Sequence, residues 1–173
     1  MCQHDVVKIR TRHGGDIKEL CELARLVHEV DGYPVLLPEN PADFVVTSNC
    51  IDAWVAVSEG DICGHVSLHT VFSDAIAEMA SRHFECERSE LVAVSRLFVS
   101  PQARGLGFGR ALLDVAVRDA RRRGLALVLD VVTSFGGAIA LYERSGWKRI
   151  GTASVAMPND KPIDEYVYVL EST

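Results

Sequence analysis

The sequence is poor in aromatic residues and in cysteine, and it contains no long apolar run. Aromatic residues make up 7% of the 173 residues, and the five cysteines are never spaced C-x-x-C, so we expect neither a disulfide framework nor a metal site. No apolar run approaches the ~18–20 residues that span a bilayer. The first residues lack the basic and then apolar layout of a secretory signal. These absences predict a cytoplasmic protein with no membrane partner.

Positive charge is also in the minority. The chain has 24 acidic and 18 basic residues and a formal net charge of −6, which argues against a protein that coats nucleic acid. Hydrophobic residues make up 48% of the chain, far more than in a disordered chain, and the length suits one packed domain. We therefore expect a single domain over residues 1–173, without nucleic acid as a partner.

Apolar periodicity divides the chain into strands and helices. The ranges predicted as strands are 5–12, 53–57, 62–72, 91–99, 126–132, 147–155 and 165–170. Helical spacing follows Asp16, which is placed to cap that helix, and recurs over 107–123 and 138–145. The segment 31–43 is expected to be a loop, and 73–90 a weakly helical excursion. A hairpin followed by strand, helix, strand, helix and strand predicts an α/β (α+β) fold with three layers.

The sharpest local signal is the segment 97–110, which reads LFVSPQARGLGFGR. An apolar strand ends at Val99, and glycines at 105, 107 and 109 then open a long helix. Such glycines let successive backbone N–H groups point into one concavity, and the helix N-terminus adds partial positive charge. Arg104 and Arg110 flank the turn. The arrangement predicts an anion site suited to a diphosphate.

Three other interpretations of this turn make different demands. A P-loop needs Gly-Lys-Ser/Thr after the glycines, and the chain has none. A dinucleotide fingerprint needs a third glycine where Arg110 stands, after a strand that opens the fold. A flexible turn without a ligand needs only the glycines, so this interpretation stays open on the turn alone.

Two motifs, one after the other along the chain, resemble those of the GNAT superfamily of acyl-CoA N-acyltransferases. The segment 102–107, QARGLG, matches the motif Q/R-x-x-G-x-G/A of that family. Further along, the segment 138–147, AIALYERSGW, is similar to the family's A-x-x-L-Y-E-x-x-G-F/W. Their order and spacing also fit the family.

The resemblance implies a mixed, twisted sheet whose fourth and fifth strands separate to admit acetyl-CoA, and no metal. The backbone of Leu97, Phe98 and Val99 would pair with pantetheine, and a backbone N–H of this strand would hold the oxyanion. Ser134 is a candidate polar contact, because Phe135 stands where the family usually has Asn. The turn residues expected to hold the pyrophosphate are Arg104, Gly105, Leu106, Gly107, Phe108, Gly109 and Arg110.

The resemblance also implies that Tyr142 lies near the thioester sulfur and acts as the general acid. Acyl transfer to an amine needs a neutral nucleophile, stabilisation of the oxyanion and an acid for the departing thiolate. A phenol, with an ordinary pKa of about 10, is protonated at neutral pH and can give its proton to a thiolate. The alternative for Tyr142 is a core aromatic residue on a helix.

The sequence does not identify one residue as the general base. Many relatives carry Glu in the fourth strand, whereas residues 91–97 read LVAVSRL without a carboxylate. Glu90, at the start of that strand, is the nearest substitute and our candidate base. Asp31, His65, His69 and Asp130 are alternatives, as is a chain of waters that carries the proton from the amine.

The sequence as a whole predicts an acetyl-CoA-dependent N-acetyltransferase in which a primary amine attacks the thioester directly. The amine is expected to enter beside the segment 31–43, with Asp31 and Tyr33 as substrate residues, and the acids of this segment favour a cationic acceptor. One alternative is a catalytically inactive, acyl-CoA-binding regulatory module. Another is a protein N-terminal or lysine acetyltransferase. The apolar C-terminal strands permit a homodimer.

Overall fold

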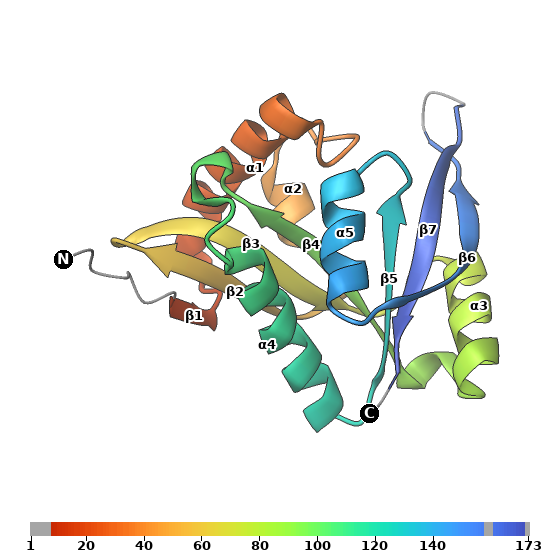
Figure 1. The fold of residues 1–173 in the computed structure, drawn as a ribbon. Coiled ribbons are helices and arrows are strands. Elements are labelled where there is room, and N and C mark those ends of the chain that lie inside the picture. Colours follow the sequence, from red (N-terminus) through yellow and green to blue (C-terminus); the bar gives the residue numbers. More distant parts are fainter. Residues whose placement is uncertain (1–7, 158–160, 172–173) are drawn as a thin grey trace. The chain divides into compact units, whose positions relative to one another are not determined.

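Strand β4 (Leu91–Val99) is shared by the two compact units of the structure, a computed structural model that describes residues 8–157 and 161–171. The first unit contains residues 8–68 and 96–118, and the second contains the other described residues. Seven strands form one mixed sheet in the order β1-β2-β3-β4-β5-β7-β6 (Figure 1). The predicted fold class is therefore confirmed.

The first unit begins with three strands, of which β2 is buried in its middle and β3 over most of its length. Its strands are β1 (Lys8–Thr11), β2 (Cys50–Ser58) and β3 (Asp61–His69). Strand β1 pairs with β2 from Lys8, opposite Val57, to Thr11. The turn between β2 and β3 is a tight hairpin, as predicted, because Glu59 and Gly60 both take positive φ, at 53° and 98°. Residues 5–7 of the first predicted strand lie outside the described residues.

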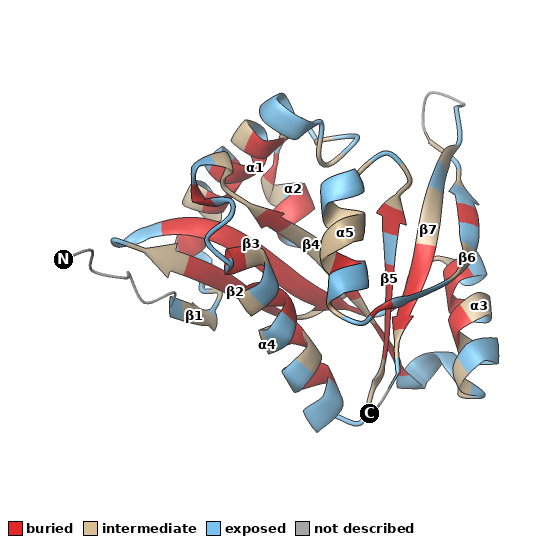
Figure 2. Ribbon diagram, in the orientation of Figure 1, coloured by how far each residue is buried: buried red, intermediate tan, exposed pale blue. Residues whose placement is uncertain are grey.

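Helices α1 (Ile17–Asp31) and α2 (Ala42–Val45) complete the core of the first unit. The buried residues of α1 recur at helical spacing (Figure 2). Their side chains pack in one cluster with Val55 and Phe98. The helix ends at Gly32, which adopts φ 71° and donates its N–H to the His28 carbonyl over 2.8 Å. The short α2 falls inside the segment predicted as a loop, because its one turn is too brief to show a period.

Asp16 does not cap α1, which corrects the sequence prediction. Its carboxylate accepts hydrogen bonds from both Arg10 guanidinium nitrogens, over 2.7 and 2.8 Å, and from the His13 N–H over 2.6 Å. The Arg10 bond is the main cause that lowers the pKa of Asp16 to about 2. The cap prediction was wrong because a strand residue six positions earlier holds the carboxylate away from the helix.

The second unit is built on strands β5 (Ala126–Val132), β6 (Lys148–Val155) and β7 (Ile163–Leu170). Strand β7 pairs antiparallel with both neighbours. Helix α3 (Asp74–Phe84) packs its apolar residues on Val128, Ala153 and Val167, and it forms a full helix where the sequence indicated weak helicity. The Ser73 hydroxyl caps it by accepting from the Ile76 N–H over 3.4 Å.

Two further helices follow the strands that matter for the site. Helix α4 (Phe108–Arg122) follows β4, and helix α5 (Gly136–Arg144) follows β5 (Figure 1). Both end before a glycine with positive φ, Gly124 and Gly146, as predicted. Strand β3 ends at His69, three residues before the predicted boundary. Among residues 8–157 and 161–171, no helix combines the length and apolar character that a membrane crossing requires.

Candidate active site

The ladder between β4 and β5 ends early. The two strands run parallel and pair from Leu91, opposite Ala126, to Ala93, opposite Val128. Beyond Val128, β5 continues for four residues that pair with β7, from Leu129 to Val132. In the described part of the second unit, the ladder between β4 and β5 therefore ends at Ala93 and Val128, and the rest of β5 is paired with β7.

Strand β4 changes its backbone conformation at Arg96. This residue has φ 52°, in the left-handed region that side chains other than glycine rarely occupy. The Arg96 guanidinium lies 5.2 Å from the centre of the Phe44 ring, and its Nε donates to the Phe44 carbonyl. The Arg96 carbonyl lies 2.9 Å from Nδ1 of His65. These contacts hold a strained residue in the middle of the strand predicted to bind pantetheine.

The predicted pantetheine-binding residues Leu97, Phe98 and Val99 follow directly. The Phe98 side chain is 4% exposed and belongs to the core of the first unit, so only its backbone is available to a ligand. The strand ends where Ser100 donates its N–H to the Cys63 carbonyl over 2.8 Å. This bond fixes the point from which the glycine-rich turn departs.

The glycine-rich turn fits a bulky anion. Gly105 and Gly107 have φ 76° and 86°, and a Cβ built on either would find no atom within 4 Å. The first backbone bond of α4 runs from the Ala111 N–H to the Gly107 carbonyl. The N–H groups of residues 108–110 therefore precede the first helical bond and have no acceptor within the helix. Open glycines beside such donors are what a diphosphate needs.

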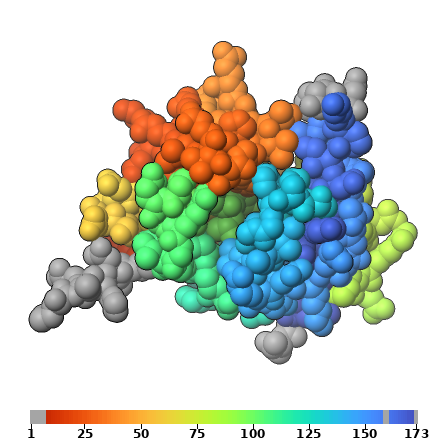
Figure 3. All heavy atoms as spheres, turned by 45° about the horizontal axis from the view of Figure 1, so that its top comes forward, coloured from red at the N-terminus to blue at the C-terminus, as the bar shows by residue number. Residues whose placement is uncertain are grey.

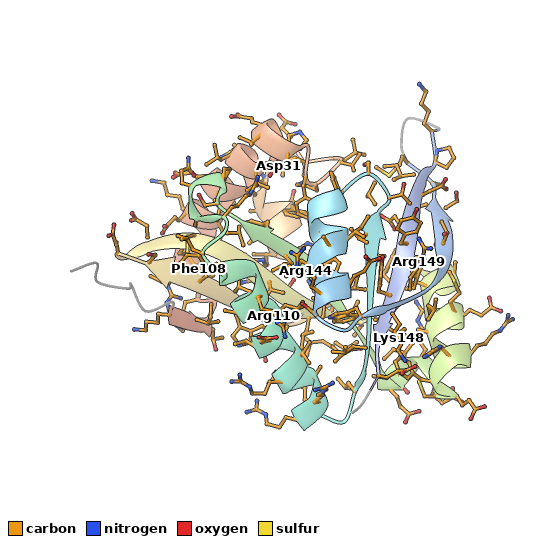
Figure 4. The ribbon with its side chains drawn as sticks, in the orientation of Figure 1. Asp31, Phe108, Arg110, Arg144, Lys148 and Arg149 are labelled. Carbon is orange, nitrogen blue, oxygen red and sulfur yellow. The ribbon has the colours of Figure 1, made fainter. Side chains whose placement is uncertain are left out.

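The side chains of the turn have different environments. Phe108 is buried, so it anchors the helix and leaves its backbone to a ligand, whereas Leu106 is 65% exposed. Arg110 points along α4, where its Nε donates to Asp114 over 2.9 Å (Figure 4). Gly109 lies between Phe108 and Arg110 in the first turn of α4.

Arg104 and Asp31 form a bidentate ion pair. The Arg104 Nη1 donates to Asp31 Oδ1 over 2.8 Å, and Nη2 donates to Oδ2. Asp31 is the last residue of α1, and the atoms of α1 and the loop after it lie against the turn (Figure 3). The structure thus joins a predicted substrate residue to a predicted cofactor residue. The sequence could not indicate the pair, because 73 positions separate its members.

Tyr33, the second predicted substrate residue, is half-buried. Its ring lies 6.0 Å from the Phe44 ring, edge-on, and 6.5 Å from the Phe98 ring. Tyr33 therefore packs the loop after α1 onto the core of the first unit.

Tyr142 lies on α5 in the second unit and is 7% exposed. Its ring packs edge-on against Trp147 at 6.2 Å and tilted against Tyr168 at 6.4 Å. Tyr168 in turn donates its hydroxyl to Glu143 over 2.9 Å. These aromatic neighbours fix the Tyr142 ring. Ser134, between β5 and α5, is exposed and its carbonyl accepts from the Gly136 N–H over 3.1 Å.

Glu90, the candidate base, is exposed at the start of β4. Its Oε2 accepts from the Glu87 N–H over 2.8 Å and so closes a short 3₁₀ turn. The alternatives His65 and His69 are both buried, at 0% and 3% exposure. Burial is the main cause that lowers the pKa of His65 to about 3, so His65 is neutral at physiological pH.

Strands β5 and β7 carry a pair of carboxyl groups, of which the sequence analysis identified only one as a candidate base. Asp130 lies opposite Val167, and Glu165 lies opposite Val132, so the two carboxyl groups are diagonal neighbours on one face of the sheet. Burial, the Asp130 charge and a hydrogen bond with Asp130 raise the pKa of Glu165 to about 7. Asp130 was an alternative base, whereas nothing in the local sequence distinguishes Glu165.

The sheet order, the early end of the β4–β5 ladder and the glycine-rich turn before α4 are typical of an α/β fold of the acyl-CoA N-acyltransferase class. The family model described as "Acetyltransferase (GNAT) family" matches residues 17–147, which is more than half of the chain. The chain therefore belongs to the GNAT acetyltransferase family, and the resemblance seen in its motifs is confirmed.

Curated relatives match over short segments. The mycothiol acetyltransferase of Geodermatophilus obscurus is 50% identical over 54 residues, which is 31% of this chain and 18% of that protein. An uncharacterized N-acetyltransferase of Methanocaldococcus jannaschii is 38% identical over 63 residues, which is 36% of this chain and 28% of that protein. The chain thus matches less than a third of the length of either relative.

Solved structures match over nearly the whole chain. The ribosomal-protein-alanine N-acetyltransferase of Brucella melitensis has a TM-score of 0.71 at 22% identity, covering 94% of this chain and 98% of its own. Arabidopsis thaliana NAA60 in complex with acetyl-CoA has a TM-score of 0.71 at 20% identity, covering 95% and 97%. These likenesses show the fold.

Proposed function

We propose that this protein transfers an acetyl group from acetyl-CoA to a primary amine by direct attack of the amine on the thioester. The observation that carries the proposal is the turn after β4, where Gly105 and Gly107 leave open space before the free N–H groups of α4. Membership of the GNAT family and the likeness to an acetyl-CoA complex support it.

The proposal gives each part of the cofactor its own residues. The turn from Arg104 to Arg110 holds the diphosphate through backbone N–H groups, and Ser134 offers a polar contact to the pantetheine arm. The backbone of residues 97–99 pairs with that arm, and a backbone N–H of β4 stabilises negative charge on the thioester oxygen. Acetyl-CoA supplies the acyl group and a thiolate leaving group.

Tyr142 is proposed to protonate the departing thiolate. Its buried ring, held between Trp147 and Tyr168, supports a fixed phenol that waits in one orientation. A proton donor held in this way raises the rate of thiolate departure without a contribution to cofactor affinity.

For the amine proton, we propose the Asp130–Glu165 pair as the acceptor ahead of Glu90. The pair lies on β5 and β7 beyond the end of the β4–β5 ladder, and the pKa of Glu165, raised to about 7, supports a carboxyl pair that shares a proton near neutral pH. The Glu90 carboxylate already accepts a backbone bond, whereas Glu165 is half-buried. A base with a pKa near 7 matches the task better.

The test is acetyl transfer itself. The protein is incubated with acetyl-CoA and three acceptor sets: small primary amines, a peptide with a free N-terminal amine, and an N-terminally blocked peptide with a free lysine. Acetylated product is measured by mass spectrometry and CoA thiol by colorimetry. Acetyl-CoA binding without thiol release for any acceptor would favour the inactive, acyl-CoA-binding alternative.

The role of Tyr142 is tested by Tyr142→Phe. We expect turnover to fall by about 100-fold or more, because a proton donor is lost, while the dissociation constant for acetyl-CoA stays the same. The matched control is Tyr166→Phe, which removes a hydroxyl from a half-buried tyrosine on β7. Unchanged turnover in Tyr142→Phe would remove this residue from the mechanism.

A further inference from the structure

His65 on β3 holds one peptide group of β4 from its carbonyl side. The group is the peptide that joins Arg96 to Leu97, and its carbonyl oxygen lies 2.9 Å from Nδ1 of His65. Because a trans peptide directs its C=O and N–H to opposite sides, the Leu97 N–H points away from the His65 ring. The bond to His65 therefore sets the direction of a backbone N–H in the strand predicted to bind the thioester.

The contacts of the ring define its tautomer. The Arg96 carbonyl is an acceptor, so Nδ1 must carry the proton and donate. Nε2 lies 3.3 Å from Nη1 of Arg12, which is always a donor, so Nε2 must accept. The same Arg12 nitrogen donates to the Val45 carbonyl over 2.6 Å, and this bond fixes the guanidinium. The ring is neutral and has one orientation in which both nitrogens are satisfied.

Packing leaves the ring no other position. His65 is 0% exposed and stacks on the Phe98 ring, with 5.2 Å between the ring centres. The charged groups that face it are Arg12, which directly follows β1, and Arg96 from β4, and both disfavour the protonated ring. Because Nδ1 donates to the Arg96 carbonyl and Nε2 accepts from Arg12, neither ring nitrogen is open to an amine proton, which argues against His65 as the general base.

The chain of hydrogen bonds also carries polarisation. The Arg12 cation donates to Nε2, Nδ1–H donates to the Arg96 carbonyl, and that carbonyl shares its peptide group with the Leu97 N–H. Each bond in such a buried chain strengthens the next. The Leu97 N–H at its end is a stronger and better aligned donor than an isolated amide. This alignment requires Arg96 to adopt an unfavourable left-handed backbone conformation, which the hydrogen bond from His65 helps to stabilise.

We propose that His65 is a positioning residue for acyl transfer, which aligns and polarises the Leu97 N–H as the donor to the thioester carbonyl oxygen. The inference rests on the proposed function, since it assumes that acetyl-CoA binds along β4. It goes further by assigning the oxyanion donor to one N–H, and the alignment of that N–H to a buried histidine and Arg12.

The test compares His65→Asn with His65→Leu. The two side chains have nearly the same shape, and both lose the stack on Phe98, but only asparagine keeps a donor at the δ position for the Arg96 carbonyl. Arg12→Met provides a third variant, which leaves His65 in place and removes the polarising charge. Thermal unfolding first establishes that each variant is folded.

The primary readout needs no acceptor. Infrared difference spectra of bound acetyl-CoA, labelled with ¹³C at the thioester carbonyl, report how strongly the protein polarises that bond. We expect the carbonyl band of wild type to lie at lower wavenumber than that of acetyl-CoA in water. His65→Asn should retain most of this shift, Arg12→Met should lose part of it, and His65→Leu should lose most of it. With an acceptor in hand, kcat of His65→Leu should fall about 10- to 100-fold, with the acetyl-CoA dissociation constant changed less than about threefold.

The outcomes separate the two proposals. If wild type does not bind acetyl-CoA, the proposed function fails. If wild type and His65→Leu bind acetyl-CoA with the same carbonyl band, the function stands and the positioning role is refuted. If His65→Leu does not fold, equal bands in wild type and Arg12→Met refute the role, and a loss of shift in Arg12→Met supports it.

Discussion

Replacing Asp31 by asparagine removes the carboxylate that holds Arg104 beside the glycine-rich turn. In the structure both Arg104 nitrogens are directed at Asp31, and this bond raises the pKa of the guanidinium. A diphosphate that binds the turn and also accepts from the Arg104 side chain must compete with Asp31 for these guanidinium donors. Asp31→Asn should therefore tighten the binding of CoA.

The expected size follows from the exposure of the pair. The side chains are 45% and 29% exposed for Arg104 and Asp31, so the pair is solvated and screened even though it is bidentate. Pairs of this kind contribute about 0.5–1 kcal/mol. The dissociation constant for CoA should therefore fall about two- to fivefold, and the gain should shrink at high salt, where the pair is screened.

Titration calorimetry with CoA at low and high salt measures this effect. The matched control is Glu29→Gln, which changes the net charge equally at an exposed position of the same helix. In an Arg104→Gln background, Asp31→Asn should have no effect. An unchanged or weaker affinity in Asp31→Asn, or an equal gain in Glu29→Gln, would refute the competition between Asp31 and the diphosphate.

Three further predictions concern pH and packing. The pKa of His65 is near 3 in the folded protein and near 6.5 in the unfolded chain. Between these values only the unfolded chain binds the proton. The free energy of unfolding therefore falls as the pH drops below 6.5, by about 2 kcal/mol at pH 5. Urea unfolding should show this loss in wild type and not in His65→Asn, and parallel curves would contradict it. The pH profile of kcat/KM should rise through about pH 7 as the Asp130–Glu165 carboxyl pair is deprotonated. In Glu165→Gln the midpoint of this profile should move to lower pH, because Asp130 then loses the neighbour that shares its proton. An unmoved midpoint excludes the pair as the base. Gly64→Ala should cost about 1–3 kcal/mol in urea unfolding, since its Cβ would lie 2.9 Å from Leu112 Cδ1 and 3.1 Å from the Phe98 carbonyl, whereas Gly14→Ala, with no atom within 4 Å, serves as the control that should cost far less.

Local patterns predicted the parts of the fold that short-range chemistry determines. Strand β4 has the predicted bounds because Pro101 and the glycines after it stop an apolar run. The turn has the predicted conformation because Gly105 and Gly107 allow positive φ. The ends of α4 and α5 follow from the glycines after them. In each of these elements, the residues that decide the structure are close neighbours in sequence.

Long-range partners were beyond the reach of such patterns. Asp16 looked like a cap, but Arg10 on a strand holds its carboxylate. The Asp31–Arg104 pair depends on how the turn returns to the end of α1.

The chemistry proposed for the site shows the same dependence. Glu165 faces Asp130 only because β7 returns beside β5 in this register. The role proposed for His65 depends on the left-handed backbone conformation of Arg96 in β4, and the sequence around Arg96 does not predict that conformation. The motifs thus indicated the family, and tertiary contacts define the residues that tune the proposed chemistry.

Thermal unfolding with and without acetyl-CoA, CoA and NADH measures whether this protein binds its proposed cofactor. A ligand at ~100 times its dissociation constant stabilises the folded state by about 2.7 kcal/mol, which is a shift of about 5–10 °C for a chain of this size. We expect this shift with acetyl-CoA and with CoA, and none with NADH. No shift with either CoA species would mean that the glycine-rich turn is structural and would contradict the proposed acetyl transfer.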